Sequence, residues 1–126
     1  MQYMLIFQSP LAEFSSRSDP AIAAANMAAW GVYIGALHGA GLVVNGHGLL
    51  PPQMGTTVRV RDGKRLVQDG PFADAKEHLG GYFVIEAPSL DVALDWAEKA
   101  PSALTGSVEV RPVMPPHPGL GAPAAN

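Results

Sequence analysis

The fold of this chain is decided by residues 56–82, which read TTVRVRDGKRLVQDGPFADAKEHLGGY. Residues 56–61 and 64–68 flank Asp62-Gly63, the dipeptide preferred in a two-residue type I′ turn. This is the strongest hairpin signal in the chain. The stretch therefore predicts a β-hairpin that is followed by a polar turn.

The register of this hairpin follows from its two-residue turn. It places Val58 opposite Val67 and Thr56 opposite Asp69. Asp69 is therefore expected at the base of the hairpin. From there the chain turns toward an apolar segment, residues 80–86, which predicts the next strand.

Two strands and an irregular segment are predicted before the hairpin. Residues 3–7 are aromatic and branched and end shortly before Pro10, which is typical of a buried strand. Residues 10–18 are polar and are predicted to be irregular. Residues 42–44 begin a second strand, which runs toward Pro51.

A long helix is predicted between these two strands. Asp19 is a preferred N-cap residue, and Pro20 suits the first helical position. Glycines that follow His38 end the helix. The side chains at helical spacing, which are expected to face the sheet, are Met27, Trp30, Ile34 and Leu37.

The remaining elements complete one domain, residues 1–114. Ser89 caps a second helix that ends at Pro101. Residues 107–113 alternate with period two, so one side of this last strand is expected to face solvent. Residues 115–126 are rich in Pro, Gly and Ala and are predicted to be a flexible tail. The expected inward stripe of the second helix is Ala93, Leu94 and Ala97.

The order of these elements predicts the fold class. Without the hairpin it is β-α-β-β-α-β, the pattern of ferredoxin-like α+β folds. Two helices cover only one face of a four-stranded sheet. We therefore expect the uncovered face to be buried against a second copy in a homodimer.

Composition excludes several classes of function. The 126 residues carry a net charge of -3 without a run of Lys or Arg, which argues against nucleic-acid binding. No cysteine is present, so disulfides, thiolate nucleophiles and Cys-ligated metals are excluded. The amino terminus does not resemble a signal peptide, and no apolar segment is expected to span a membrane. A soluble cytoplasmic protein is predicted.

The motif Asp69-Gly70-Pro71-Phe72, followed by Lys76-Glu77 and Leu79-Gly80-Gly81-Tyr82, resembles the signature of the YCII-related family, in its DGPF-motif branch. The similarity extends over residues 3–113. It implies a dimeric α+β barrel built from ferredoxin-like subunits, and it implies no established reaction. YCII-related proteins are proposed to use a His/Asp pair in a cleft. The chain departs from the usual motif at Asp74-Ala75 and at His78.

Asp69 is the first candidate catalytic residue, and two interpretations of it stay open. An Asp before Gly-Pro often accepts backbone N–H bonds in a turn. Alternatively, its carboxylate opens into a cleft with apolar walls from Phe72 and Tyr82, where it acts as a general base.

The partners of Asp69 are chosen from nearby titrating groups. His47, between two glycines, and His78, after Lys76-Glu77, are candidate acids or bases. The candidate ligand-binding residues are Phe72, Lys76, Glu77, Tyr82 and Arg59. Alternatively, Lys76 and Glu77 are solvated charges on a loop, and His47 is a structural histidine at the surface. The histidine spacing predicts no metal site, and the absence of Gly-rich cofactor motifs predicts no cofactor.

Two functions remain open from the sequence. The first is a cofactor-independent enzyme that uses acid–base chemistry on a small anionic or aromatic molecule. The second is a non-catalytic small-molecule-binding or accessory protein, in which the same residues only hold a ligand.

Overall fold

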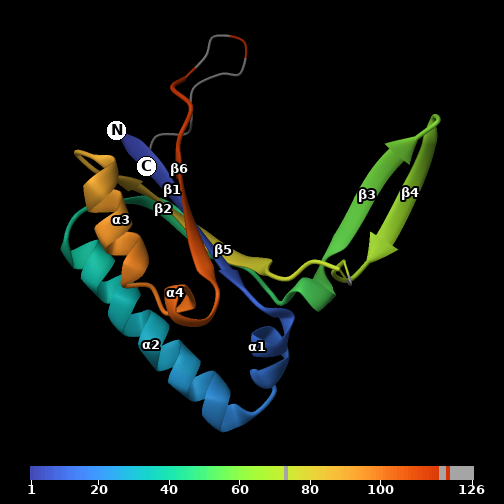
Figure 1. The fold of residues 1–126 in the computed structure, drawn as a ribbon, viewed down its shortest axis with the longest axis horizontal. Helices are drawn as coiled ribbons and strands as arrows, with labels where there is room; N and C mark the ends of the chain where they lie inside the picture. The colour runs from blue at the N-terminus through green and yellow to red at the C-terminus, as the bar shows by residue number, and fades with distance from the viewer. Residues whose placement is uncertain (73, 117–118, 120–126) are drawn as a thin grey trace.

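The computed structural model describes residues 1–72, 74–116 and 119. Its main sheet has the strand order β2-β5-β1-β6, and all neighbouring strands are antiparallel (Figure 1). This arrangement confirms the predicted ferredoxin-like α+β fold. The strands are β1 Gln2–Ser9, β2 Val43–Gly48, β5 His78–Glu86 and β6 Ser107–Pro112.

The helices α2 and α3 cover one face of this sheet (Figure 1). As predicted, Asp19 caps α2 by accepting a hydrogen bond of 2.9 Å from the Ala21 N–H, and Ser89 caps α3 through the Val92 N–H. The helical segments are α1 Leu11–Ser16, α2 Pro20–Gly39, the short 3₁₀ helix η1 Pro52–Met54, α3 Leu90–Glu98 and α4 Ser102–Thr105.

The core lies between the sheet and these helices. Every second residue of β1 is buried, and Phe7 is the centre of the packing. Its ring lies 4.9 Å from Trp30, 6.0 Å from Tyr33 and 6.1 Å from Phe83, in edge-to-face geometry. Such contacts add to the stabilisation from burial. Phe7 therefore joins α2 to both central strands.

The inward faces of the helices were only partly predicted. Trp30, Ile34 and Leu37 pack on the core as expected, but Met27 is 76% exposed. Because α2 is apolar all round and carries no charged residue, its sequence does not mark one face. In α3, Leu94 is also exposed, since the helix approaches the sheet through small, buried alanines.

The prediction that residues 10–18 are irregular is wrong. They contain α1, and its Phe14 is only 4% exposed. Phe14 packs against Gly80, where a Cβ atom would lie 3.2 Å from the ring. A tertiary contact therefore holds this polar segment as a helix. The four-residue α4, which follows Pro101, was also not predicted.

The predicted hairpin is confirmed. It consists of β3 Thr56–Arg61 and β4 Lys64–Asp69, with Val58 opposite Val67 as expected. Asp62 and Gly63 have φ angles of 52° and 71°, the left-handed values that a type I′ turn requires. The hairpin projects away from the main sheet (Figure 1). We call residues 56–69 the arm.

The expectation that no apolar segment reaches membrane-spanning length is wrong. The helix α2 has 20 residues, and an 18-residue stretch of it has a mean hydropathy of 1.3, so by length and composition it is able to cross a bilayer. Core helices of soluble proteins meet the same criterion, and α2 places Tyr33 and Leu37 in the core. Most of the predicted tail, including His117, lies outside the described residues.

A buried phenol gives the fold a specific pH dependence. The Tyr33 hydroxyl donates to the Trp96 carbonyl oxygen at 2.9 Å, and burial raises the pKa of Tyr33 to about 12 from 10.0. The unfolded chain therefore loses this proton more easily than the native state. The stabilisation is complete below about pH 10 and is lost as the pH rises toward 12.

We predict that Tyr33→Phe lowers the free energy of unfolding by about 1 kcal/mol at pH 7, because it removes one buried hydrogen bond. The variant should also lose less stability than the wild type between pH 10 and 11. Urea denaturation of both proteins across this range measures the difference. Parallel pH profiles would contradict the assignment to Tyr33.

Candidate functional site

A cleft lies between α2 and the sheet, and its larger part is an apolar groove of about 540 Å³. One wall is α2, with Met27, Trp30 and Ile34, and the other is formed by β2 and β5. Gly46 shapes this wall, because a Cβ atom there would overlap the ring of Phe83. The groove therefore offers aromatic surface to a small ligand.

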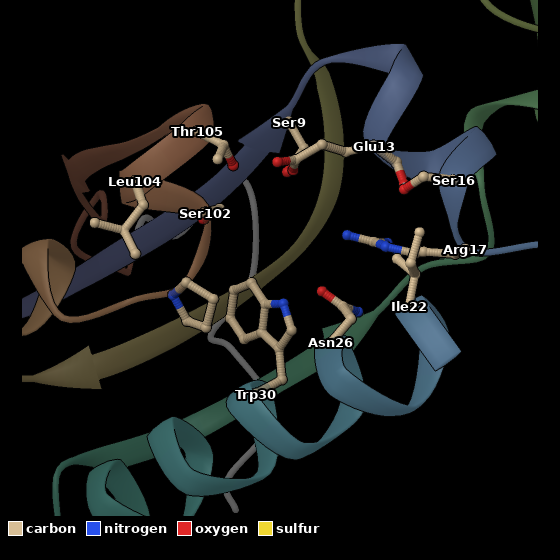
Figure 2. A pocket seen from close by; sticks show the side chains of 11 residues that line it. Ser9, Glu13, Ser16, Arg17, Ile22, Asn26, Trp30, Ser102, Leu104 and Thr105 are labelled. Carbon is tan, nitrogen blue, oxygen red and sulfur yellow. The ribbon is translucent and has the colours of Figure 1, made fainter. Parts of the chain in front are cut away.

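The smaller part of the cleft is a polar cavity of about 210 Å³ (Figure 2). It lies at the end of β1, between α1, the first half of α2 and α4. Both parts are lined by Ser9, Arg17, Asn26 and Trp30, so they adjoin. The cleft thus has one polar end and one aromatic end.

Two charged side chains point into the polar cavity. Glu13 and Arg17 are four residues apart, on α1 and its C-cap, and therefore share one side of this segment. Figure 2 shows the carboxylate of Glu13, the guanidinium of Arg17 and the amide of Asn26 facing the same space. The Arg17 guanidinium also lies 4.8 Å above the Phe14 ring, which orients it.

Hydroxyl groups complete the polar cavity. Ser9 ends β1 and is 5% exposed, and Ser102 opens α4 and is 4% exposed. Among the residues that the structure describes, the Ser102 hydroxyl has no hydrogen-bond partner. An unpaired buried hydroxyl costs about 1–3 kcal/mol. This group is therefore available to a water molecule or a ligand in the cavity.

The chemistry of the polar cavity follows from these groups. A guanidinium binds oxyanions through paired N–H donors, and hydroxyls donate to the same oxygens. A carboxylate within reach of a bound molecule can accept its proton. The arrangement is therefore able to hold an anionic oxygen and to transfer a proton beside it.

Asp69 lies elsewhere, at the base of the arm. Its side chain is exposed and accepts a hydrogen bond of 3.2 Å from the Thr56 hydroxyl. Asp69 lines neither part of the cleft. Nearby, the Arg59 guanidinium lies 4.3 Å above the Phe72 ring, so these two predicted ligand-binding residues contact each other.

His47 and Tyr82 form a pair on neighbouring strands. The His47 Nδ1 atom lies 2.9 Å from the Tyr82 hydroxyl. Both residues border the apolar groove, but Tyr82 is opposite Ile6 on β1, so the two side chains lie on the sheet face away from α2. In the described part of the chain, no hydrogen bond links Asp69 to His47 or His78. The structure therefore does not join the predicted acid–base groups by a direct contact.

The other predicted site residues lie at the start of β5. His78 is opposite Ser9 on β1, and within the described residues its buried Nε2 atom has no hydrogen-bond partner. Glu77 accepts a hydrogen bond of 2.6 Å from the Ser107 hydroxyl, and Lys76 is exposed. Neither cavity is lined by any of these three residues. Their functional roles stay predictions.

Sequence reasoning missed the residues of the polar cavity. The spacing of Glu13 and Arg17 was a usable signal, but it indicates a shared face only if the segment is helical. Ser102 gave no signal, because its burial depends on α4. Within residues 1–72, 74–116 and 119, no group of three His, Asp or Glu side chains is placed to hold a metal ion.

One solved structure has a similar fold over nearly its whole length. It is 5-chloro-2-hydroxyhydroquinone dehydrochlorinase (TftG) from Burkholderia phenoliruptrix AC1100, in complex with 2,5-dihydroxybenzoquinone. The TM-score is 0.52 at 18% sequence identity, over 96% of this chain and 99% of that chain. At this identity the likeness concerns the fold.

A sequence relative is "Uncharacterized protein R00369" from Rhizobium meliloti (strain 1021), which is 45% identical over 73 residues. The match spans 56% of this chain and 59% of the relative's length. A family model covers nearly the whole described domain. By the match of residues 1–116 to the YCII-related domain, the chain belongs to the YCII-related domain family.

Proposed function

We propose that this protein is an enzyme that performs acid–base chemistry on a small aromatic molecule with an anionic oxygen, without a resident cofactor. The single observation that carries the proposal is the cleft itself. In it, Arg17 and Glu13 face a polar cavity that adjoins a groove lined by aromatic side chains. The aromatic ring of a substrate thus fits the groove, and its charged oxygen fits the adjoining polar cavity.

In the proposed reaction, the aromatic body of the substrate packs on Trp30 in the apolar groove. The Arg17 guanidinium binds its anionic oxygen, and the hydroxyls of Ser9 and Ser102 donate hydrogen bonds to the same group. The Glu13 carboxylate accepts a proton from the adjacent atom of the substrate. Because Arg17 neutralises the developing negative charge, proton removal becomes easier.

His47 and Tyr82 remain candidate acids or bases, but Tyr82 is opposite Ile6 on β1, which places this pair on the uncovered face of the sheet and not on the face that α2 covers. A histidine that is bonded to a phenol can donate or accept a proton through either group. Asp69 and His78, which the sequence indicates as acid or base, also remain candidate catalytic residues. They require a substrate that reaches beyond the two cavities.

The structural neighbour supports an aromatic or quinonoid substrate. The name of TftG describes a dehydrochlorinase of a chlorinated hydroxyhydroquinone, and its structure holds 2,5-dihydroxybenzoquinone. We extend from this only the class of molecule, a flat ring that bears ionisable oxygens. Membership of the DGPF-motif branch and a cytoplasmic location are further parts of the proposal.

We predict different effects for the two charged residues of the polar cavity. Arg17→Gln should weaken binding of 2,5-dihydroxybenzoquinone, measured by calorimetry, by about 10- to 100-fold, because a charge-assisted hydrogen bond is lost. Glu13→Gln should leave this binding nearly unchanged. For substrates found in a panel of hydroxylated rings, Glu13→Gln should lower kcat by about 10²–10⁴-fold.

Arg61→Gln, near the far end of the arm, serves as the control for the loss of a positive charge and should change neither quantity. Full turnover by Glu13→Gln would contradict the proposed base. Binding that depends on Arg17, without turnover of any ring in the panel, would favour the non-catalytic binding protein.

Ser102 gives a prediction that separates ligand binding from folding. Ser102→Ala should leave the free energy of unfolding unchanged or raise it by up to about 1 kcal/mol, because it removes an unpaired buried hydroxyl. The same change should weaken binding of 2,5-dihydroxybenzoquinone. Ser107→Ala is the matched control and should destabilise, since its hydroxyl donates to Glu77. Marked destabilisation by Ser102→Ala would show that the Ser102 hydroxyl has a hydrogen-bond partner in the folded protein and would contradict the prediction.

We also propose the homodimer of a dimeric α+β barrel, with the uncovered sheet face as the contact. Met4 and Ile6 lie on this face, on the side of β1 away from the core, and Val84 of β5 is opposite Met4. Their apolar side chains favour contact with a second sheet.

Light scattering at micromolar concentration should therefore give the mass of two chains. Ile6→Glu should shift the protein to one chain, because it places a charge in the contact. Val32→Glu, on the outer side of α2 where Val32 is 76% exposed, should leave the mass unchanged. A wild-type protein with the mass of a single chain would contradict the dimer.

A further inference from the structure

The arm lacks structural support within its own chain. Its strands β3 and β4 pair only with each other in a two-stranded sheet. Isolated two-stranded hairpins are marginally stable in water, and they need a third strand or a packed surface. Figure 1 shows the arm projecting away from the main sheet and the helices. Within the described structure, no third strand pairs with this element.

One side of the arm carries three exposed valines together with Arg65. The register Val58 opposite Val67 and Val60 opposite Arg65 places three valines on the same side. Their exposures are 54% for Val58, 62% for Val60 and 53% for Val67. We call these three residues the valine side. The opposite side is partly covered, because Phe72 lies under Arg59 there.

Charge distinguishes the arm from the rest of the chain. The arm holds four of the eight Lys and Arg residues and two of the eleven Asp and Glu residues, so its net charge is +2 against −5 for the remainder. Two arms therefore repel each other, and basic side chains on exposed strands oppose pairing at their edges. The acidic remainder of another copy attracts the arm.

The base of the arm fixes how it leaves the main body. The Gly70 N–H donates to the Gly55 carbonyl oxygen at 2.8 Å, directly beyond the last pair of the hairpin. Gly70 has a φ of 79°, which a residue with a side chain rarely adopts. This closed base holds the two strands together while the valine side stays exposed.

We propose that the arm is an assembly element whose valine side packs on the body of a second copy of this chain. The second copy supplies the apolar surface that the arm lacks, and its acidic remainder attracts Arg65, which lies on the valine side. In a symmetric pair, each copy receives the arm of the other. This contact adds to the proposed sheet contact and does not depend on the proposed enzymatic function.

A cross-linking experiment locates the contact. Because the chain has no cysteine, Val58→Cys creates a unique site for a photoreactive maleimide. Equal amounts of ¹⁴N- and ¹⁵N-labelled copies are mixed, illuminated and digested. We expect cross-links of mixed isotope composition, from the arm of one copy to residues outside 56–69 of the other. Cross-links within one copy only, or from arm to arm, would overturn the proposal.

The matched control is Leu66→Cys. Leu66 lies on the opposite side of the arm, opposite Arg59, and is 48% exposed, which is close to the value for Val58. It should give several-fold fewer cross-links between copies. Equal yields from the two positions would show that the valine side has no special role and would overturn the proposal.

A second experiment measures the contribution of the valine side to assembly. Val58→Thr with Val67→Thr keeps the β-branched shape that the strands prefer but adds a hydroxyl at each position. Sedimentation should show that the dimer dissociation constant rises at least about tenfold, because apolar burial is lost. Leu66→Thr should change this dissociation constant less than about twofold, because Leu66 lies outside the proposed contact and buries no apolar surface there. An unchanged constant in the double variant, or a wild-type protein that never dimerises, would refute the arm contact.

Discussion

The packing of Phe7 against α2 is the contact on which the rest of the structure depends. Phe7 comes from the central strand β1, and its ring meets Trp30 and Tyr33 of α2 and Phe83 of β5. These contacts fix the distance between the helix and the sheet. The apolar groove lies beside them, and both Phe7 and Trp30 line it. The same rings therefore hold the fold together and shape its binding surface.

The polar cavity differs from this aromatic packing, because in the described part of the chain its side chains do not pair with one another to stabilise the fold. Ser102 is buried without a partner, and Glu13 and Arg17 face the cavity from one short helical segment. Groups that stabilised only the fold would pair with each other or with solvent. The unpaired Ser102 hydroxyl is a cost in stability that a ligand can offset. This is the physical reason for proposing the cavity as the site of function.

Two surfaces remain uncovered in a single chain, the open face of the sheet and the valine side of the arm. Both carry apolar side chains beside polar ones, and both belong to elements that usually need a partner for stability. The charge difference between the arm and the remainder of the chain is the basis for proposing a second copy as this partner. Assembly and fold are thus expected to be linked in this protein.

Local signals in the sequence determined the elements whose causes are local. The Asp62-Gly63 turn fixed the register of the hairpin, and Asp19 and Ser89 fixed the starts of α2 and α3. The tertiary structure alone decided that the segment around Phe14 is helical and that Met27 is exposed. It also decided the polar cavity, because Ser102 lies far in the sequence from Ser9 and Arg17. Only packing between elements brings such residues together, and no local pattern encodes that.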